Sequence, residues 1–270
     1  MSRVFMTGST DGLGLAAART LIAAGHEVVL HARSSPRAGT LSDLAARSAG
    51  VVIGDLGSAA ETRSIAEQVR GIGRMDAVIH NAGIYREPGR GTTPEGHAKT
   101  LAVNTLAPYL LTAWIERPDR LIYLSSGMHR GADASLRDMD WVERRWEASR
   151  AYSESKLYVT ALAFAVARQW PSVLSHAVDP GWVPTRMGGA GAPDDLTMGH
   201  LTQTWLAVSE DSAAKSSGGY WYHRERQKPA ADALEPEFQD RLLARLAELT
   251  GIALFGARNV DSTPPRSTSE

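Results

Sequence analysis

The stretch TGSTDGLG at positions 7–14 constrains the fold most, because it places three glycines between an apolar segment and an alanine-rich one. Gly8, Gly12 and Gly14 allow the backbone to turn tightly and to approach another group closely. Residues 3–8 predict a strand, and residues 13–24 predict a helix whose N-terminus would face a bound phosphate. The stretch therefore predicts a phosphate-binding loop, with a plain structural turn as the alternative.

The rest of the chain alternates short apolar runs with helical patterns. Further strands are predicted at 26–33, 50–56, 75–83, 120–126, 173–181 and 218–223. Such near-continuous apolar runs are typical of strands that helices cover on both faces. We therefore predict an α/β fold: a single-domain, Rossmann-type, doubly wound parallel sheet over residues 1–256, with about seven strands in the order 3-2-1-4-5-6-7. The polar tail 257–270 is predicted to be disordered.

Composition narrows the class of protein. The chain has 270 residues, 43% apolar and 22% charged, and its net charge of −1 gives no electrostatic reason to bind nucleic acid or an anionic membrane. The absence of cysteine excludes disulfides and fits a reducing cytoplasm. The first apolar stretch is too short for a signal peptide, and residues 157–167 are too few to span a membrane. A cytoplasmic protein is expected, and no side-chain cluster has metal-ligand character.

A tyrosine and a lysine stand one helical turn apart in the stretch AYSESKLYVT. Tyr152 and Lys156 would share a helix face, and Lys156 is one of only four lysines beside twenty-five arginines. A phenol with a pKa near 10 is a poor base at neutral pH, and a nearby ammonium lowers that pKa by favouring the phenolate. The pair is either a proton-transfer site or an ordinary stabilising helix pair.

These motifs together resemble the short-chain dehydrogenase/reductase family, in particular its retinol-dehydrogenase-like and carbonyl-reductase-like members. T-G-x3-G-x-G at 7–14, N-A-G at 81–83, Y-x3-K at 152–156 and P-G-x-V-x-T at 180–185 occur in family order within seven matched segments. The resemblance implies hydride chemistry, with the catalytic residues Asn104, Ser126, Tyr152 and Lys156. It implies a cofactor site made of Gly8, Ser9, Thr10, Gly12, Leu13, Gly14, Arg33, Asp55, Leu56, Asn81, Ala82, Gly83, Tyr152, Lys156, Pro180, Gly181, Val183 and Thr185.

The resemblance also implies a role for each catalytic residue. Ser126 would hold the substrate carbonyl oxygen, Tyr152 would transfer the proton, and Lys156 would also hold the ribose hydroxyls of the nicotinamide. The backbone carbonyl of Asn104, within a kinked helix, would order a water of the proton relay; a polar surface residue is the alternative. A turn or capping role is assigned to Ser125.

The end of the second predicted strand bears on cofactor choice. NAD sites place an acid there, whereas this chain has Ala32 followed by Arg33. A guanidinium pairs well with a 2′-phosphate, so NADP(H) is favoured over NAD(H). A solvated surface arginine is the alternative.

The chain departs from the family pattern at three places. Asp179 replaces a frequent asparagine, from which we expect a change in backbone positioning without loss of activity. Ser126 and Tyr152 are 26 residues apart, and the segment from Thr105 to the fifth strand predicts a short helix. The segment 156–170 is apolar nearly all round, which predicts a sheet on one side and, on the other, either a partner in a homo-oligomer or a cover from the same chain.

The substrate pocket is expected at the carboxyl ends of the strands, with walls from 84–96, 127–150 and 184–205. The candidate wall residues are Tyr85, Met128, His129, Trp141, Trp146, Trp182, Met187 and His200. They favour an apolar carbonyl or alcohol, unless these loops pack on themselves; His129 is interpreted as a wall or surface residue. The leading hypothesis is an NADP(H)-dependent oxidoreductase; the alternatives are an epimerase or dehydratase and a non-catalytic NADP(H)-sensing regulatory protein.

Overall fold

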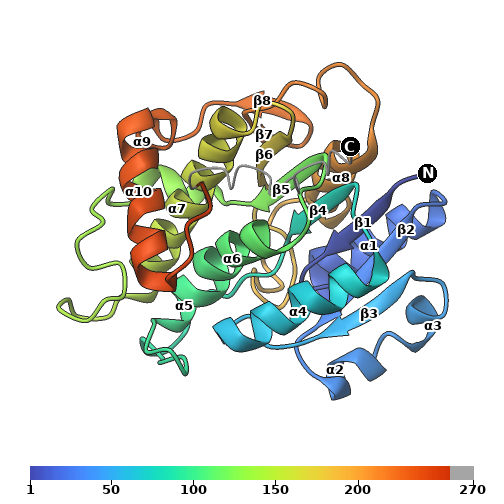
Figure 1. Ribbon diagram of the computed structural model, residues 1–270, viewed down its shortest axis with the longest axis horizontal. Helices are drawn as coiled ribbons and strands as arrows, with labels where there is room; N and C mark the ends of the chain where they lie inside the picture. The colour runs from blue at the N-terminus through green and yellow to red at the C-terminus, as the bar shows by residue number, and fades with distance from the viewer. Residues whose placement is uncertain (256–270) are drawn as a thin grey trace, which may run out of the picture.

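A computed structural model describes residues 1–255, which form one eight-stranded sheet with helices on both faces (Figure 1). The strand order is β3-β2-β1-β4-β5-β6-β7-β8, parallel except for the β7–β8 pair. The fold class and the order of the first seven strands are thus predicted correctly. The strands are β1 (Arg3–Met6), β2 (Glu27–Ala32), β3 (Gly50–Ile53), β4 (Ala77–His80), β5 (Arg120–Leu124), β6 (Leu174–Asp179), β7 (Gly219–Tyr222) and β8 (Glu225–Gln227).

Two hydrophobic cores lie on the two faces of the sheet, because successive strand residues point to opposite sides. Phe5 and Val78 join one core, while their neighbours Met6 and Ile79 join the other. Every residue of β4 is buried, as expected for a central parallel strand.

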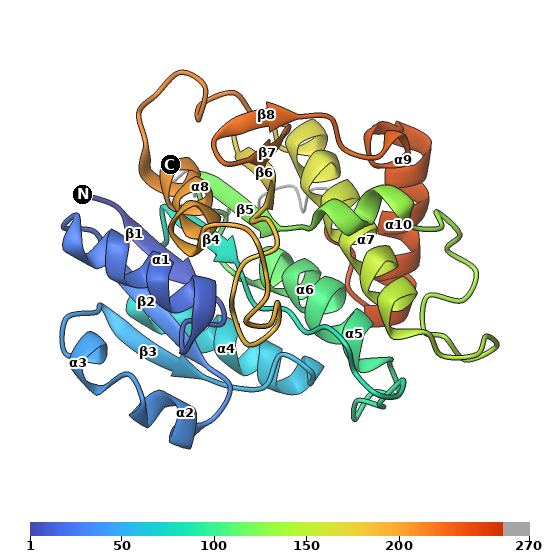
Figure 2. The same ribbon diagram turned by 180° about the vertical axis from the view of Figure 1, so that it is seen from behind.

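The helices divide between these faces, with α1 and α8 packed together on one and α4, α6 and α7 on the other (Figures 1 and 2). The α-helices are α1 (Gly12–Ala23), α2 (Ser35–Gly39), α3 (Ser42–Ala45), α4 (Ala59–Ile72), α5 (Lys99–Leu101), α6 (Ala107–Trp114), α7 (Ala148–Gln169), α8 (Leu196–Val208), α9 (Ala231–Leu234) and α10 (Pro236–Thr250). A π-helical turn, η1 (Ala102–Leu106), links α5 to α6, and a 3₁₀ helix, η2 (Gly127–Gly131), follows β5.

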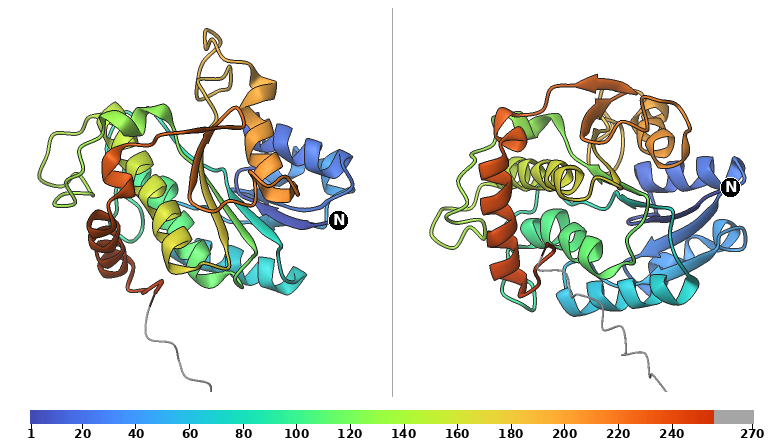
Figure 3. Two further views of the ribbon diagram at one scale, coloured as in Figure 1. Left: turned by 90° about the horizontal axis from the view of Figure 1, so that it is seen from above. Right: turned by 45° about the horizontal axis from the view of Figure 1, so that its top comes forward.

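The outer side of α7 is covered by the chain itself. Figure 3 shows α10 outside α7, and Phe238, Leu242 and Leu246 of α10 are buried in the same core as Leu157 and Leu162 of α7. Of the two covers expected for this apolar helix, the structure therefore has the one supplied by the same chain.

β8 is the strand that the sequence did not predict. Its three residues are all exposed, so it has no apolar pattern to reveal it. It pairs with β7 through a two-residue turn in which His223 and Arg224 both have positive φ (49° and 65°). Such turns ordinarily carry asparagine and glycine, and neither residue gives that signal.

The helix after Thr105 is short, as predicted: α6 has eight residues. The tail prediction for 257–270 lies outside the described residues. Within residues 1–255, no helix is both long and apolar enough to cross a membrane.

Candidate active site

The loop between β1 and α1 needs its glycines for close backbone approach. Gly8 has φ +69°, and a Cβ there would lie 3.0 Å from Ala82 Cα. A Cβ on Gly14 would lie only 2.1 Å from the Gly8 carbonyl oxygen. The N-terminus of α1 has no side-chain cap and no acidic residue in its first turn. Its free backbone N–H groups are of the kind that bind an anion, and phosphate binding by this loop stays a prediction.

Two side chains from neighbouring strands support this loop. Asn81 Nδ2 donates to the carbonyl oxygens of Thr7 and Gly8 at 3.0 and 3.2 Å. Gly8 N donates to Nδ1 of His31 at 2.9 Å, so the proton of His31 is on Nε2, 2.9 Å from the Gly54 carbonyl oxygen. Burial lowers the pKa of His31, consistent with this neutral form. Sequence reasoning did not identify His31, because only the tertiary structure brings β2 beneath the loop.

Three other predicted loop residues have different surroundings. Ser9 is fully buried and donates to the Met6 carbonyl oxygen at 2.8 Å, so its side chain serves the fold. Leu13 lies against α8 beside Gly199. Thr10 accepts a hydrogen bond from Arg37 Nη2 at 2.9 Å.

Arg37 brings a second guanidinium to the end of β2. Arg33 is exposed directly after this strand, whereas Arg37, on α2, also pairs with Asp11 at 2.6 Å. Arg186 reaches the same Asp11 oxygen at 3.3 Å. Sequence reasoning named Arg33 alone; Arg37 carries no motif signal and is placed by the short α2 turn.

The carboxyl ends of β3 and β4 differ in how they present their predicted residues. Asp55 Oδ1 accepts from Gly57 N at 2.8 Å, while Leu56 is buried in the core. Ala82 N donates to Thr7 Oγ1 at 3.0 Å. A Cβ on Gly83 would lie 3.4 Å from both Asn104 Oδ1 and Lys156 Nζ, so this glycine leaves space between two predicted catalytic residues.

Of the two serines after β5, Ser126 has the capping role that was expected of Ser125. Ser125 is buried and bonded to Thr160 at 2.6 Å between hydroxyl oxygens. Ser126 caps η2, accepting from Met128 N at 3.3 Å, and its hydroxyl lies near enough to Tyr152 to lower the pKa of that phenol. The prediction that gave the capping role to Ser125 is therefore wrong, because η2 begins one residue later.

Tyr152 and Lys156 of α7 lie together at the carboxyl end of β5. Lys156 Nζ lies 5.5 Å from the centroid of the Tyr152 ring and donates to the Leu124 carbonyl oxygen at 2.7 Å. Burial lowers the pKa of Lys156 to about 8. Burial raises the pKa of Tyr152; the neighbouring Ser126 hydroxyl lowers it, and Asp179 and Tyr85 raise it further. Lys156 is not among the groups that shift this pKa, so the lowering expected from its ammonium is absent in the chain alone.

Asn104 is buried in η1 and is not a surface residue. Its Oδ1 accepts from Ile84 N at 2.9 Å, and its Nδ2 donates to the Ile84 carbonyl and to Ser155 Oγ, each at 3.0 Å. Pro108 has no N–H, so it cannot give the Asn104 carbonyl its α-helical hydrogen bond. The helix changes register here, with Ala107 N bonded to the Ala102 carbonyl, as the predicted kink requires.

The segment after β6 meets the glycine loop. A Cβ on Gly12 would lie 3.4 Å from Thr185 Cγ2, so the predicted phosphate and nicotinamide segments lie side by side. Gly181 has φ +80° and packs against Asp194, which accepts from Trp182 N at 2.6 Å. Val183 is buried, and Pro180 begins this turn.

Some expected wall residues lie at the site. Tyr85 packs against Tyr152, with the ring centroids 4.5 Å apart and the ring planes tilted by 43°. Met128, Trp182 and Met187 are exposed apolar side chains on the segments that flank Ser126 and Val183.

Two expected wall residues are structural instead. His129 is fully buried, donating from Nδ1 to the Ser126 carbonyl and accepting from Ala230 N. Burial lowers its pKa, and neither a wall nor a surface role fits. His200 contacts Thr20 of α1 at 3.0 Å, on the far side of the glycine loop.

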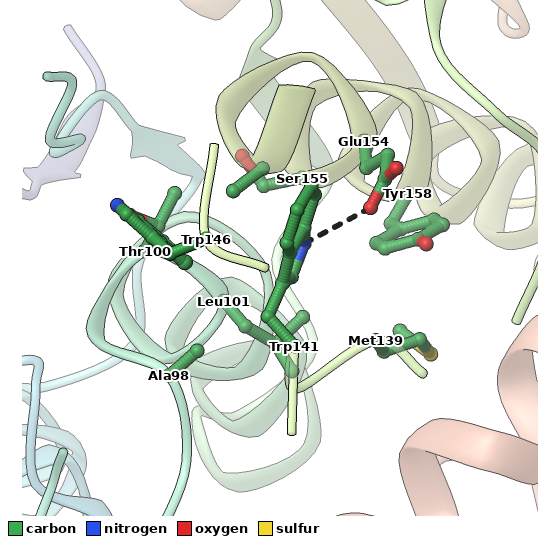
Figure 4. A pocket seen from close by; sticks show the side chains of 10 residues that line it. Ala98, Thr100, Leu101, Met139, Trp141, Trp146, Glu154, Ser155 and Tyr158 are labelled. Carbon is green, nitrogen blue, oxygen red and sulfur yellow. Dashed lines mark hydrogen bonds between the residues drawn. The ribbon is translucent and has the colours of Figure 1, made fainter. Parts of the chain in front are cut away.

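The loop between η2 and α7 is fastened to α7 from outside. Glu154, 2% exposed at its side chain, pairs with both terminal nitrogens of Arg144 at 2.9 and 2.8 Å. Trp141 donates to Glu154 at 3.1 Å within a small cavity (Figure 4). Trp146 packs edge-on against Trp141 and donates to the Glu87 carbonyl at 3.1 Å. Trp141 was expected to line the substrate pocket or to belong to a loop that packs on itself. The structure shows the second arrangement, with this loop packed on itself and on α7.

The sheet is doubly wound, with a glycine loop after β1, a serine after β5, and a tyrosine and a lysine on α7. This arrangement is that of a nicotinamide-dinucleotide oxidoreductase. A family model described as enoyl-(acyl carrier protein) reductase matches residues 8–210. The chain is 38% identical to short-chain dehydrogenase chyC of Penicillium rubens over 259 residues, covering 94% of this chain and 99% of the relative. The chain therefore belongs to the short-chain dehydrogenase/reductase family and is an oxidoreductase of it.

Two further comparisons are with more distant proteins. Human retinol dehydrogenase 13 is 27% identical over 281 residues, which cover 92% of this chain and 84% of the relative. A solved structure, a blue fluorescent protein from a metagenomic library in complex with NADPH, superposes with a TM-score of 0.66 at 20% identity. It covers 82% of this chain and 95% of its own. This last likeness is one of fold.

Proposed function

We propose that the chain is an NADP(H)-dependent enzyme that interconverts a carbonyl and an alcohol, with Tyr152 as the acid or base. The observation that carries the proposal is that Ser126, at the start of η2, lies beside Tyr152 and Lys156 of α7. The Ser126 hydroxyl neighbours the Tyr152 phenol, and Lys156 Nζ lies 5.5 Å from the centroid of the Tyr152 ring. The bound dinucleotide would supply or accept the hydride at the substrate carbon.

The chain's own residues handle the proton. Ser126 holds the substrate oxygen beside Tyr152, which donates its phenolic proton to that oxygen in reduction and recovers it in oxidation. Lys156 places a positive charge near the phenolate that forms. The Asn104 carbonyl, which Pro108 cannot bond, holds a water through which Lys156 exchanges protons with solvent.

The cofactor would lie along the strand ends. The glycine loop holds its phosphates, and Arg33 and Arg37 provide two guanidinium groups where an NAD site carries an acid. The NADPH complex of a structural relative supports the same cofactor class. Because Tyr85 and the exposed apolar side chains of Met128 and Met187 border the site, the substrate is expected to be apolar around its carbonyl.

Tyr152→Phe tests the proposal. Because it removes only the transferred proton, NADPH binding should persist while turnover of a carbonyl panel falls at least about a thousandfold. Tyr158→Phe is the matched control: this tyrosine, also on α7, bonds the Ser135 carbonyl at 3.0 Å on the outer side. It should keep its turnover. Wild-type rates in Tyr152→Phe refute the assignment, and a wild-type protein that binds NADPH but turns over no carbonyl favours the sensing role.

A further inference from the structure

Asp179, the last residue of β6, places a second carboxylate inside the active site. Its side chain is buried, and both of its oxygens have partners. Oδ1 accepts from Gly181 N at 3.1 Å, and Oδ2 accepts from the Tyr220 hydroxyl of β7 at 3.0 Å. Burial and two hydrogen bonds from different elements hold the carboxylate in a fixed position.

This position is next to the proton-transfer groups. β5 and β6 pair so that Val178 faces Leu124, whose carbonyl oxygen accepts the hydrogen bond of the Lys156 ammonium. On the other side, a Cβ on Gly127 would lie 3.1 Å from Asp179 Oδ2. The carboxylate thus lies between the strand end that binds Lys156 and the turn that carries Ser126.

Charged and titratable groups face Asp179 from every neighbouring element. They are Tyr152 and Lys156 of α7, His129 and Arg130 of η2, Tyr220 and Tyr222 of β7, and Asp194 of the following loop. The Asp179 charge raises the pKa of Tyr152 in the same direction as burial, and it raises the pKa of Lys156 against burial. His129 is neutral, so it does not offset the Asp179 charge.

We propose that Asp179 is a positioning residue whose negative charge keeps the proton on Tyr152 and biases the site toward carbonyl reduction. This inference rests on the proposed function. In reduction the substrate carbon gains a hydride from the reduced nicotinamide, the substrate oxygen gains the phenolic proton of Tyr152, and the phenolate regains a proton from water. Oxidation begins from the phenolate, which a neighbouring carboxylate disfavours.

Asp179→Asn tests the role of the charge. The amide oxygen can accept from Gly181 and the amide N–H can donate to the Tyr220 oxygen, so both contacts are conserved. The pH at which alcohol oxidation is half-maximal should fall by about one unit, and the kcat of alcohol oxidation at pH 7 should rise about tenfold. Tyr220→Phe removes the hydrogen bond but keeps the charge, and its pH shift should be clearly smaller. An unchanged profile in Asp179→Asn, or an equal shift in both variants, overturns the inference.

A second measurement needs no substrate. Ultraviolet titration of the Tyr152 phenolate, taken as the difference between each protein and its Tyr152→Phe version, should show a lower midpoint in Asp179→Asn. A wild type without turnover refutes the proposed function, and the titration then decides the role of Asp179 alone. If Asp179→Asn does not fold, Asp179→Ser removes the same charge, and an unchanged midpoint in that variant overturns the inference.

Discussion

The cofactor side and the catalytic side of this site are held in different ways. Around the glycine loop, residues are fixed by backbone contacts that only glycine permits, such as the approach of Gly14 to the Gly8 carbonyl. On the catalytic side, Lys156, Glu154 and Asp179 are buried charged groups that polar partners on other segments hold in place. The first kind of restraint is steric, and the second is electrostatic and depends on burial. Substitutions should therefore fail differently on the two sides.

A substitution in the glycine loop should have the largest effect. Gly14→Ala places a methyl group 2.1 Å from the Gly8 carbonyl oxygen and 2.5 Å from Asn81 Nδ2. The loop has to move, so we expect NADPH binding to be lost and the free energy of unfolding to fall by roughly 3 kcal/mol. Calorimetric NADPH titration and urea unfolding measure both.

Gly71→Ala in α4 is the matched control, because nothing lies within 4 Å of its added Cβ. It should raise stability by about 0.5–1 kcal/mol. Normal NADPH binding by Gly14→Ala contradicts the steric account.

The electrostatic side should lose stability when a buried charge loses part of its pairing. Glu154→Gln removes the more buried of the two carboxylates that pair with Arg144, while Asp138 stays 3.4 Å from Arg144 Nε. This change should cost roughly 2 kcal/mol of unfolding free energy and raise the substrate KM, because the loop before α7 is held less firmly. Urea unfolding and steady-state kinetics measure the two effects. Glu143→Gln, which breaks the exposed pair with Arg137, should cost under about 0.5 kcal/mol. Equal losses in both variants contradict the importance of burial.

A charge on the side of the glycine loop sharpens the comparison, because its removal should affect cofactor binding much more than folding. Arg37→Gln should raise the KM for NADPH about tenfold and leave the KM for NADH nearly unchanged, since a guanidinium pairs with the 2′-phosphate. The partly exposed Arg37 also pairs with Asp11, so a small stability loss is expected. Equal effects on both cofactors place Arg37 outside the 2′-phosphate site.

The smallest expected effect concerns a hydrogen bond between two loops. A hydrogen bond from His97 to Asp140, 2.9 Å long, joins the loop before α5 to the loop before α7 and raises the pKa of His97. A raised pKa in the folded state means that this stabilisation is complete below about pH 6.5 and is lost as the pH rises through the folded-state value.

Wild-type unfolding free energy should therefore fall relative to that of His97→Gln between pH 6 and pH 9, by about 1 kcal/mol or less. Urea unfolding at both pH values measures this difference. A constant difference between the two proteins shows that His97 does not titrate in this range.

The sequence by itself predicted seven of the eight strands, their order and the glycine loop. Apolar runs of strand length and glycines at fixed offsets are visible in the sequence, because each follows from the local needs of a buried strand or a tight turn. The Y-x3-K spacing likewise placed Tyr152 and Lys156 on one face of α7.

Only the tertiary structure decided which charged groups surround the site and which helix covers the outer side of α7. In the sequence, Asp179 is only one departure from the family pattern. The β5–β6 pairing brings its carboxylate beside Ser126 and Lys156. Arg37 has no motif, and α10 covers α7 although Leu242 of α10 follows Leu162 of α7 by 80 residues in the chain. The shifts in pKa at Tyr152 and Lys156 arise chiefly from burial, which depends on every element packed around them. Burial is a property of the assembled fold, so no local pattern of residues determines it.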